Sequence, residues 1–163
     1  MATIAGNSNY AIAIASATTG AAGSETPSGD IVYLFAESVK GSVKNNDKRK
    51  IVAAEKIIKI VTGKTNLQVK LTKCTISKEV TATATAEINA ITDQFRDWGF
   101  KGQSAKCYIF VKNTADSTYV KISWSRPAGV HQQFMAGYIE GYDWSMMKGK
   151  IFVIDTLTFS QVN

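Results

Sequence analysis

The sequence predicts a mainly β protein with one α-helix, in which two packed antiparallel sheets form a sandwich or barrel flanked by the helix. Most apolar runs are short and alternate with the period of two that is typical of strands. A single segment has the three-and-four spacing of an amphipathic helix. The 163 residues, 45% of them hydrophobic, suffice for one independent core. No run approaches the roughly 18 apolar residues of a membrane-spanning helix, so we expect no membrane insertion.

The beginning of the chain differs from the rest, because its first thirty residues hold only two charged side chains. Within them Tyr10, Ile12 and Ile14 alternate with alanines, which predicts a strand that is apolar on both faces and needs cover on both. The following TTGAAGSETPSGD has the composition of a linker. We therefore expect residues 1–30 to form an extended N-terminal assembly arm that lies on another subunit, and residues 31–163 to form a single β-rich domain.

Short predicted strands follow one another in the first half of this domain. The run IVYLFAES (31–38) predicts a buried strand, and VKGSVKNNDKRK predicts a solvated loop. IVAAEKIIKIV fits a helix or a hairpin, and we favour strands from about Lys56 onward. Alternation then predicts strands around Leu67–Leu71 and Val80–Ala86, separated by a turn near Ser77–Glu79.

One helix is distinguished by its period. Ile88, Ile91, Phe95 and Trp98 recur at spacings of three and four, which predicts an amphipathic helix that ends near Gly99. Beyond it, KCYIFVKNTADSTYVKISW predicts a hairpin, and QFMAGYIEGYDW and KIFVIDTLTFSQV predict further strands. Together these segments give roughly eight strands and one helix, which favours a β-sandwich or barrel.

The net charge of +6 is concentrated in one stretch. Residues 1–39 carry three acids and no base, residues 40–78 carry eleven lysines or arginines against two acids, and the remainder is balanced. Lysines that neutralise phosphates give nucleic-acid binding without sequence preference. The basic stretch holds no aromatic residue that would stack on bases, so a solvated or subunit-facing charged patch is favoured over nucleic-acid binding.

Groups for catalysis or metal binding are scarce. His131 is the only histidine, which excludes a two-histidine zinc site, and it lies in a predicted loop. Asp93 and Asp97 are four apart on the predicted helix but lie off its apolar stripe, as on a solvated face. Cys74 and Cys107 lie within apparent strands and are expected to be core residues, although two cysteines could form one disulfide. We expect no enzyme, no cofactor and no metal.

The order of these elements resembles that of the tail tube proteins of long-tailed phages and of related contractile injection systems. The matching parts are the N-terminal arm, IVYLFAES, VKGSVKNNDKRK, IIKIVTGKTNLQVKL, the helix AEINAITDQFRDWGF and the closing strand IFVIDTLTFS. The resemblance implies two sheets flanked by a helix, and hexameric rings that stack into a tube. It also implies a passive conduit in the phage tail, assembled in the host cytoplasm, with a sheath or baseplate protein as a further partner and DNA only as passing cargo.

We therefore expect a structural subunit that assembles with copies of itself through sheet edges and terminal arms. The residues expected at subunit interfaces lie in the arm and in the lysine-rich loop, and they are Tyr10, Ile12, Ile14, Lys40, Lys44, Lys48, Arg49 and Lys50. Because a lumen that conducts DNA is expected to be neutral or acidic, these basic residues would face outward or an adjacent ring. Two alternatives stay open: a monomeric nucleic-acid-binding β-barrel that uses residues 40–78, and a secreted fimbrial or adhesive subunit.

Overall fold

The structure is a computed structural model of the chain. It describes residues 2–6, 8, 10–21, 25–45, 48–51, 57–60, 65–76, 82–100, 106–112, 118–121, 137–147 and 151–161. The elements in this part of the chain are β1 (Ala2–Ala5), β2 (Ile12–Thr19), β3 (Thr26–Leu34), β4 (Ser38–Asn45), β5 (Lys48–Ile51), β6 (Ile57–Ile60), β7 (Thr65–Cys74), α1 (Ala82–Phe100), β8 (Tyr108–Lys112), β9 (Tyr119–Lys121), β10 (Gly137–Met147) and β11 (Ile151–Gln161). The predicted mainly β fold with one helix is confirmed.

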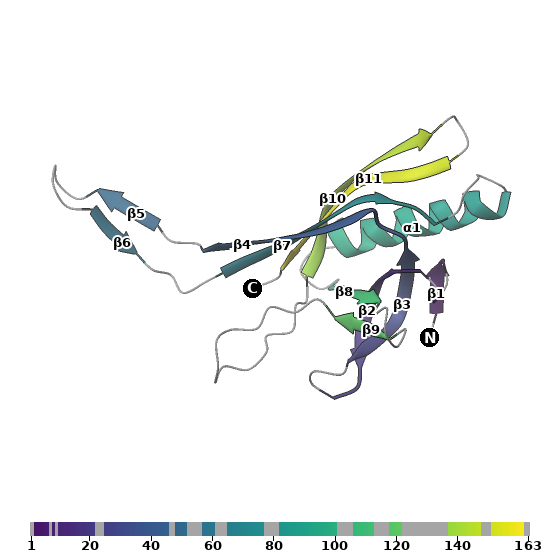
Figure 1. Cartoon of the computed structure of the whole chain (residues 1–163), viewed down its shortest axis with the longest axis horizontal. Helices are drawn as coiled ribbons and strands as arrows, with labels where there is room; N and C mark the ends of the chain where they lie inside the picture. The colour runs from purple at the N-terminus through teal and green to yellow at the C-terminus, as the bar shows by residue number, and fades with distance from the viewer. Residues whose placement is uncertain are drawn as a thin grey trace.

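Two main sheets share one core and form an open, sandwich-like arrangement rather than a closed barrel (Figure 1). The five-stranded sheet has the order β1-β3-β2-β8-β9, and the four-stranded sheet has the order β10-β11-β7-β4. Neighbouring strands are antiparallel, except that β1 pairs with β3 in parallel. β5 and β6 form a separate hairpin that lies beyond the far ends of β4 and β7 (Figure 1).

The chain joins the two sheets at close crossings. Between β3 and β4, Phe35 exchanges two backbone hydrogen bonds with Thr75, the residue after β7. Beside β8, Cys107 pairs in the same way with Gly137, the first residue of β10. A Cβ at Gly137 would lie 2.3 Å from the ring of Phe159, so this crossing requires glycine. The two sheets are thereby fixed to each other at two corners.

α1 lies on the core side of the four-stranded sheet (Figure 1). Its residues Ile91, Phe95 and Trp98 are buried in the main core, and Ile88 is partly buried against it. The ring of Phe95 lies edge-on to that of Tyr142 in β10, with the ring centroids 5.4 Å apart. The predicted helix and its assignment to the core are confirmed.

β2 is buried on both faces by its own subunit. It pairs with β3 on one side and β8 on the other, and it is the middle strand of its sheet. Ile12 and Ile14 belong to the main core and are 2% and 0% exposed. The other face belongs to a second cluster, which consists of Ala13, Ala15, Ile31, Tyr33 and Phe110, bordered by Tyr10, Tyr108 and Tyr119. The cover that the alternating pattern requires therefore comes from the same chain.

The prediction that residues 1–30 form an arm and linker apart from the domain is wrong where the structure describes them. TTGAAGSETPSGD contributes the end of β2 and the beginning of β3, which pair with each other. Ser16 of β2 and Gly29 of this segment allow the two strands to pair closely. Ser16 lies at a shift in register, its Oγ accepts a hydrogen bond from the Asp30 amide at 2.9 Å, and Gly29 beside it has a φ of +74°.

Two other segments differ from expectation. VKGSVKNNDKRK, expected as a loop, contributes β4 and β5. Val39 and Val43 alternate with polar residues and pair with β7, and β5 pairs with β6. Residues 82–86, expected in a strand, begin α1, because an alternation of alanine with threonine is also compatible with a helix. The predicted hairpin after the helix is confirmed by the pairing of β8 with β9, and its predicted turn at 113–117 lies outside the described residues.

Replacing Ile14 with alanine should lower the free energy of unfolding by about 2–5 kcal/mol, because the side chain is fully buried and its loss leaves a cavity. Ile14→Val removes one methylene and should cost about 0.5–1.5 kcal/mol. Denaturant-induced unfolding followed by tryptophan fluorescence measures both variants. If the start of the chain were an arm outside the domain, both variants would unfold like the unchanged protein.

Candidate assembly surface

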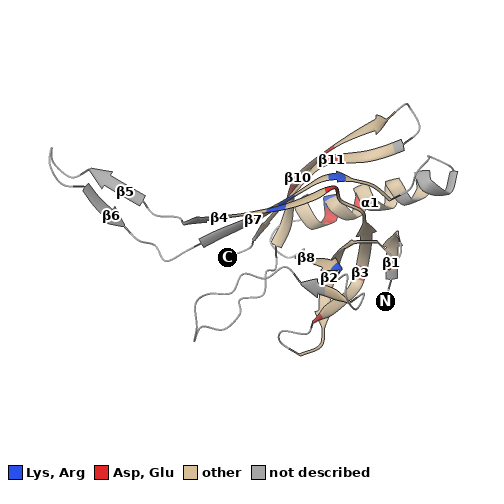
Figure 2. Ribbon diagram, in the orientation of Figure 1, with Lys and Arg blue, Asp and Glu red and all other residues tan. Residues whose placement is uncertain are grey.

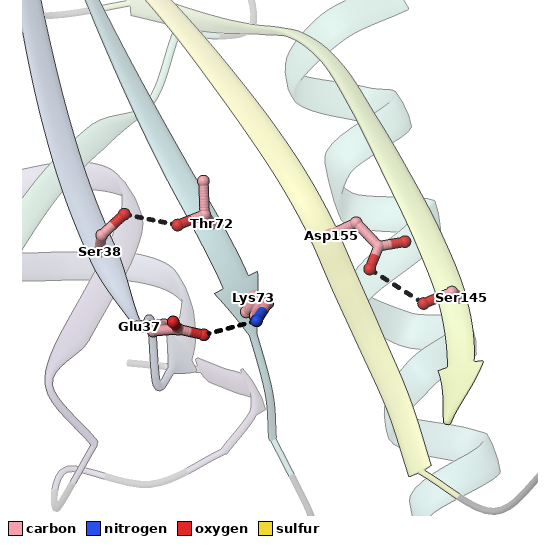
Figure 3. A network of polar contacts seen from close by, with 6 residues as sticks. All are labelled: Glu37, Ser38, Thr72, Lys73, Ser145 and Asp155. Atoms are coloured by element: carbon pink, nitrogen blue, oxygen red, sulfur yellow. Dashed lines mark hydrogen bonds and ion pairs between the residues drawn. The ribbon is translucent and has the colours of Figure 1, made fainter. Parts of the chain in front are cut away.

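The four-stranded sheet has one face on the core and one face turned away from it. In β7, Val69 and Leu71 are buried, so the alternating Gln68, Lys70 and Thr72 lie on the opposite face. We call this opposite face the outer face. Figure 3 shows it with α1 behind the sheet.

Hydrogen bonds between side chains cross the outer face. Gln68 Nε2 and Ser160 Oγ both donate to Glu140 Oε2, each at 2.6 Å. An open hollow of this face is lined by Gln68, Lys70, Glu140, Gly141, Asp143, Thr156 and Thr158, and also by Tyr142, whose ring packs against Phe95 on the core side. Among the residues that the structure describes, no three histidine, cysteine, aspartate or glutamate side chains are grouped as metal ligands.

Neighbouring strands hold the other acidic side chains of this face. Thr156 Oγ1 donates to Asp143 Oδ2 at 2.9 Å, and Ser145 Oγ donates to Asp155 Oδ1 at the same distance (Figure 3). Both bonds join β10 to β11. The polar groups of the outer face are therefore ordered by the sheet itself.

The end of the sheet near β4 is ordered in a similar way. Ser38 and Thr72 share a hydrogen bond between their hydroxyl groups, and Lys73 Nζ lies 3.2 Å from Glu37 Oε2 (Figure 3). The side chains of Lys73 and Glu37 are about two-thirds exposed, so this ion pair contributes little to stability.

The two edge strands of this sheet differ in charge. β4 contains Lys40 and Lys44 and no acidic residue, whereas β10 contains Glu140 and Asp143 and no lysine or arginine. Lys40 also lies directly opposite Lys70 of β7. The sheet is therefore basic toward the β4 edge and acidic toward the β10 edge (Figure 2).

Both edges also expose apolar groups on the core side of the sheet. Trp144 of β10 lies opposite the buried Ile154, yet it is 58% exposed. Val39 of β4 lies opposite the buried Leu71 and is 39% exposed. A Cβ at Gly41 would meet nothing within 4 Å. The core thus does not extend over the whole of the sheet, and uncovered apolar surface remains at both edges.

Three of the residues predicted at subunit interfaces make contacts within their own subunit. The Tyr10 hydroxyl donates to the Ile76 carbonyl, and the Tyr10 ring lies 4.3 Å from that of Phe35. Ile12 and Ile14 are buried in the main core. The prediction that Ile12 and Ile14 contact another subunit is wrong, because intramolecular packing already covers them, whereas an interface role of the partly buried Tyr10 stays a prediction.

The residues that precede β2 are held by the β8–β9 hairpin. Lys112 Nζ donates to the Ser8 carbonyl at 2.8 Å. The Tyr119 hydroxyl donates to the carbonyls of Ser8 and Tyr10. Burial, together with the neighbouring Tyr33, raises the pKa of Tyr119 to about 12, so its hydroxyl remains a donor well above neutral pH.

Of the predicted basic interface residues, the structure describes the side chain of one. Lys40 is exposed at the β4 edge. Lys44 belongs to the same strand, and Lys48, Arg49 and Lys50 belong to β5, but their side chains lie outside the described part of the structure. A role of these five residues in assembly stays a prediction.

Sequence reasoning missed the β10 edge. The segment GYIEGYDWSMM combines exposed Trp144 with Glu140 and Asp143 and contains no lysine. This composition indicates an interface only when the strand is known to lie at the edge of a sheet. Strand order depends on pairings between distant segments, and neither alternation nor composition reports it.

The other candidate groups are distributed over the fold. Asp93 forms an exposed ion pair with Arg96 at 3.3 Å, as expected of a solvated helix face, whereas Asp97 is half-buried. His131 lies outside the described residues. No described helix is long and apolar enough to cross a membrane.

Both cysteines are buried and free, which confirms that they are core residues. Burial raises the pKa of Cys74 to about 12 and also raises the pKa of Cys107. A thiol that is both protonated and buried is a poor nucleophile.

Comparison of the chain with protein-family models, with curated proteins and with solved structures finds no match. Function is therefore inferred from the fold and from the outer face and edges of the four-stranded sheet.

Neither thiol should react with the disulfide reagent DTNB in the folded protein at pH 8, and raising the pH to about 10 should not start the reaction, because Cys74 remains protonated. Unfolding in guanidinium chloride should make both thiols reactive. The measurement is the absorbance of the released thiolate. Rapid reaction of one thiol in the native protein would contradict this prediction.

Proposed function

We propose that the chain is a structural subunit that assembles with copies of itself into a tube or filament through the edges of its four-stranded sheet. The observation that carries the proposal is that β4 and β10 end this sheet and, beyond the crossing at Gly137, pair with no other described strand along their outer sides. An edge strand presents unpaired N–H and C=O groups that accept a further strand.

The length and composition of β10 support this proposal. β10 spans eleven residues and contains neither lysine nor proline, two residues that commonly blunt an edge against pairing. It also exposes Trp144, Met146 and Met147. Pairing with another copy would satisfy its backbone groups and cover these side chains together.

We further propose that the assembly is the tail tube of a phage or of a related injection system, and that it serves as a passive conduit in the virion. The mainly β fold with a flanking helix that the resemblance implies supports this, as do β3, α1 and β11, which keep their places in the order of elements, whereas the expected arm and polar loop are strands of the sheets. The hairpin β5–β6 lies beyond the body of the subunit, which suits contact with a neighbouring ring (Figure 1). A sheath or baseplate protein would be a further partner, and DNA would be passing cargo.

Negative-stain microscopy and analytical ultracentrifugation of the purified protein test the proposal. Tubes, rings or filaments are expected at high protein concentration. A single monomeric species at every concentration would contradict self-assembly. Titration with duplex DNA tests the alternative of a monomeric nucleic-acid-binding protein, which requires tight binding that weakens steeply with salt.

Trp144→Lys should prevent polymer formation while leaving the subunit folded, because it replaces a largely exposed apolar side chain, which pairing would cover, with a charge that pairing would remove from water. Asn89→Lys adds the same charge at an exposed position of α1 and is the matched control. Light scattering reports assembly, and circular dichroism during heating reports the fold. Equal polymerisation of the two variants would contradict the role of β10.

A further inference from the structure

We infer that the edges meet in one particular pairing, in which β10 of one subunit adds antiparallel to β4 of the next, with Trp144 opposite Val39. This inference rests on the proposed self-assembly, and it specifies the partner of each edge and the register. The partner is a second copy of this chain.

Strand direction permits this pairing. All neighbours in the four-stranded sheet are antiparallel and the number of strands is even, so β4 and β10 run in opposite directions. A second copy placed beside the first in the same orientation therefore presents its β10 antiparallel to β4. The joined sheet keeps the antiparallel hydrogen-bond pattern throughout, which is slightly more stable per residue than the parallel one.

On the core side, the register brings the uncovered apolar groups together. Trp144 and Val39 lie on this side and are both exposed within the single subunit. The next pair on the same side places Tyr142 opposite Gly41, beside which there is open space. Because the ring of Tyr142 packs against Phe95 of its own subunit, the register needs only that Gly41 leaves room beside it.

On the outer face, the same register brings opposite charges together. It places Lys40 opposite Asp143 and Ser42 opposite Gly141, and all four residues are exposed. Opposite charges directly across two strands attract, whereas like charges in that position are destabilising. A shift of one residue would turn Trp144 to the outer face, and a shift of two residues would separate the charged pair.

The charges also favour pairing of β4 with β10 over pairing of two identical edges. A two-fold dimer through β4 would bring Lys40 and Lys44 of both copies together, and a two-fold dimer through β10 would bring Glu140 and Asp143 together. Pairing of β4 with β10 avoids both contacts. Each copy then offers one edge to each of two neighbours, which is the arrangement that closes into a ring or continues as a filament.

A cysteine cross-link tests the register. Ser42→Cys combined with Gly141→Cys in one chain should give a ladder of disulfide-linked multimers when assembled particles are oxidised, because the two positions are directly opposite. The buried Cys74 and Cys107 are present in every variant and do not contribute. The matched controls are the two single variants, which should give no covalent multimers. Non-reducing electrophoresis and mass spectrometry of the linked peptides provide the measurement.

The outcomes separate this inference from the proposed function. A ladder linked through positions 42 and 141 supports the pairing. Covalent dimers from Ser42→Cys alone, or polymers of the double variant that give no ladder, would overturn the pairing while self-assembly still holds. If the unchanged protein stays monomeric in the microscope and the double variant gives no ladder, the proposed function fails as well.

An exchange of charges tests the pairing independently of cysteine. Lys40→Glu and Asp143→Lys should each raise the concentration needed for assembly about tenfold, because each places like charges opposite one another. An equimolar mixture of the two variants should restore assembly, since the substituted β4 of one meets the substituted β10 of the other. Asp143→Asn keeps an acceptor for Thr156 and should give an intermediate effect. A mixture that assembles no better than either variant alone would overturn the pairing.

Discussion

The fold depends on the burial of β2 from both sides. Its alternating isoleucines and alanines leave no polar face for solvent, so both faces must be packed. Ile12 and Ile14 complete the main core, and burial of each such side chain contributes roughly 1.5–3 kcal/mol. The alanine face is closed by the cluster that contains Tyr33 and Phe110. Because β2 is the middle strand, the positions of β3 and β8 follow from it.

The open edges of the four-stranded sheet follow from the limited size of this core. α1 packs against β1 and β10, and the close crossing at Phe35 and Thr75 fixes the start of β4 beside the end of β7. From there β4 and β7 leave the body of the subunit (Figure 1). Val39 is consequently exposed although Leu71 opposite it is buried. The same packing that stabilises the subunit leaves one end of the sheet without a partner.

The sequence predicts well what depends on local period. The stripe of Ile91, Phe95 and Trp98 marks the helix and its buried side, and alternation marks most strands. The pattern around Ile12 and Ile14 correctly shows that two faces need cover, but it does not say whether a sister molecule or the same chain supplies it. That source is decided by pairings with β3 and β8, which are distant in sequence.

The candidate assembly surface was less predictable for the same reason. Lysines at 40 and 44 are conspicuous in a polar segment, yet only the pairing of Val39 with Leu71 shows that this segment is a strand. The acidic residues of β10 are unremarkable until strand order places them at the opposite end of the sheet from β4. Charge composition therefore indicated the β4 edge of the surface, whereas the β10 edge could be recognised only from the strand order.

The distribution of charge distinguishes an edge strand that is protected against aggregation from an edge strand that can pair with another copy. Lysines on an edge strand commonly prevent aggregation, and Lys40 alone would fit that role. Protection of the whole sheet, however, needs the same sign at both edges, because then every contact between copies is repelled. Here β4 is basic and β10 is acidic, so repulsion acts only between like edges. In the proposed assembly, such a sheet would resist two-fold dimers and would still admit the contact between unlike edges.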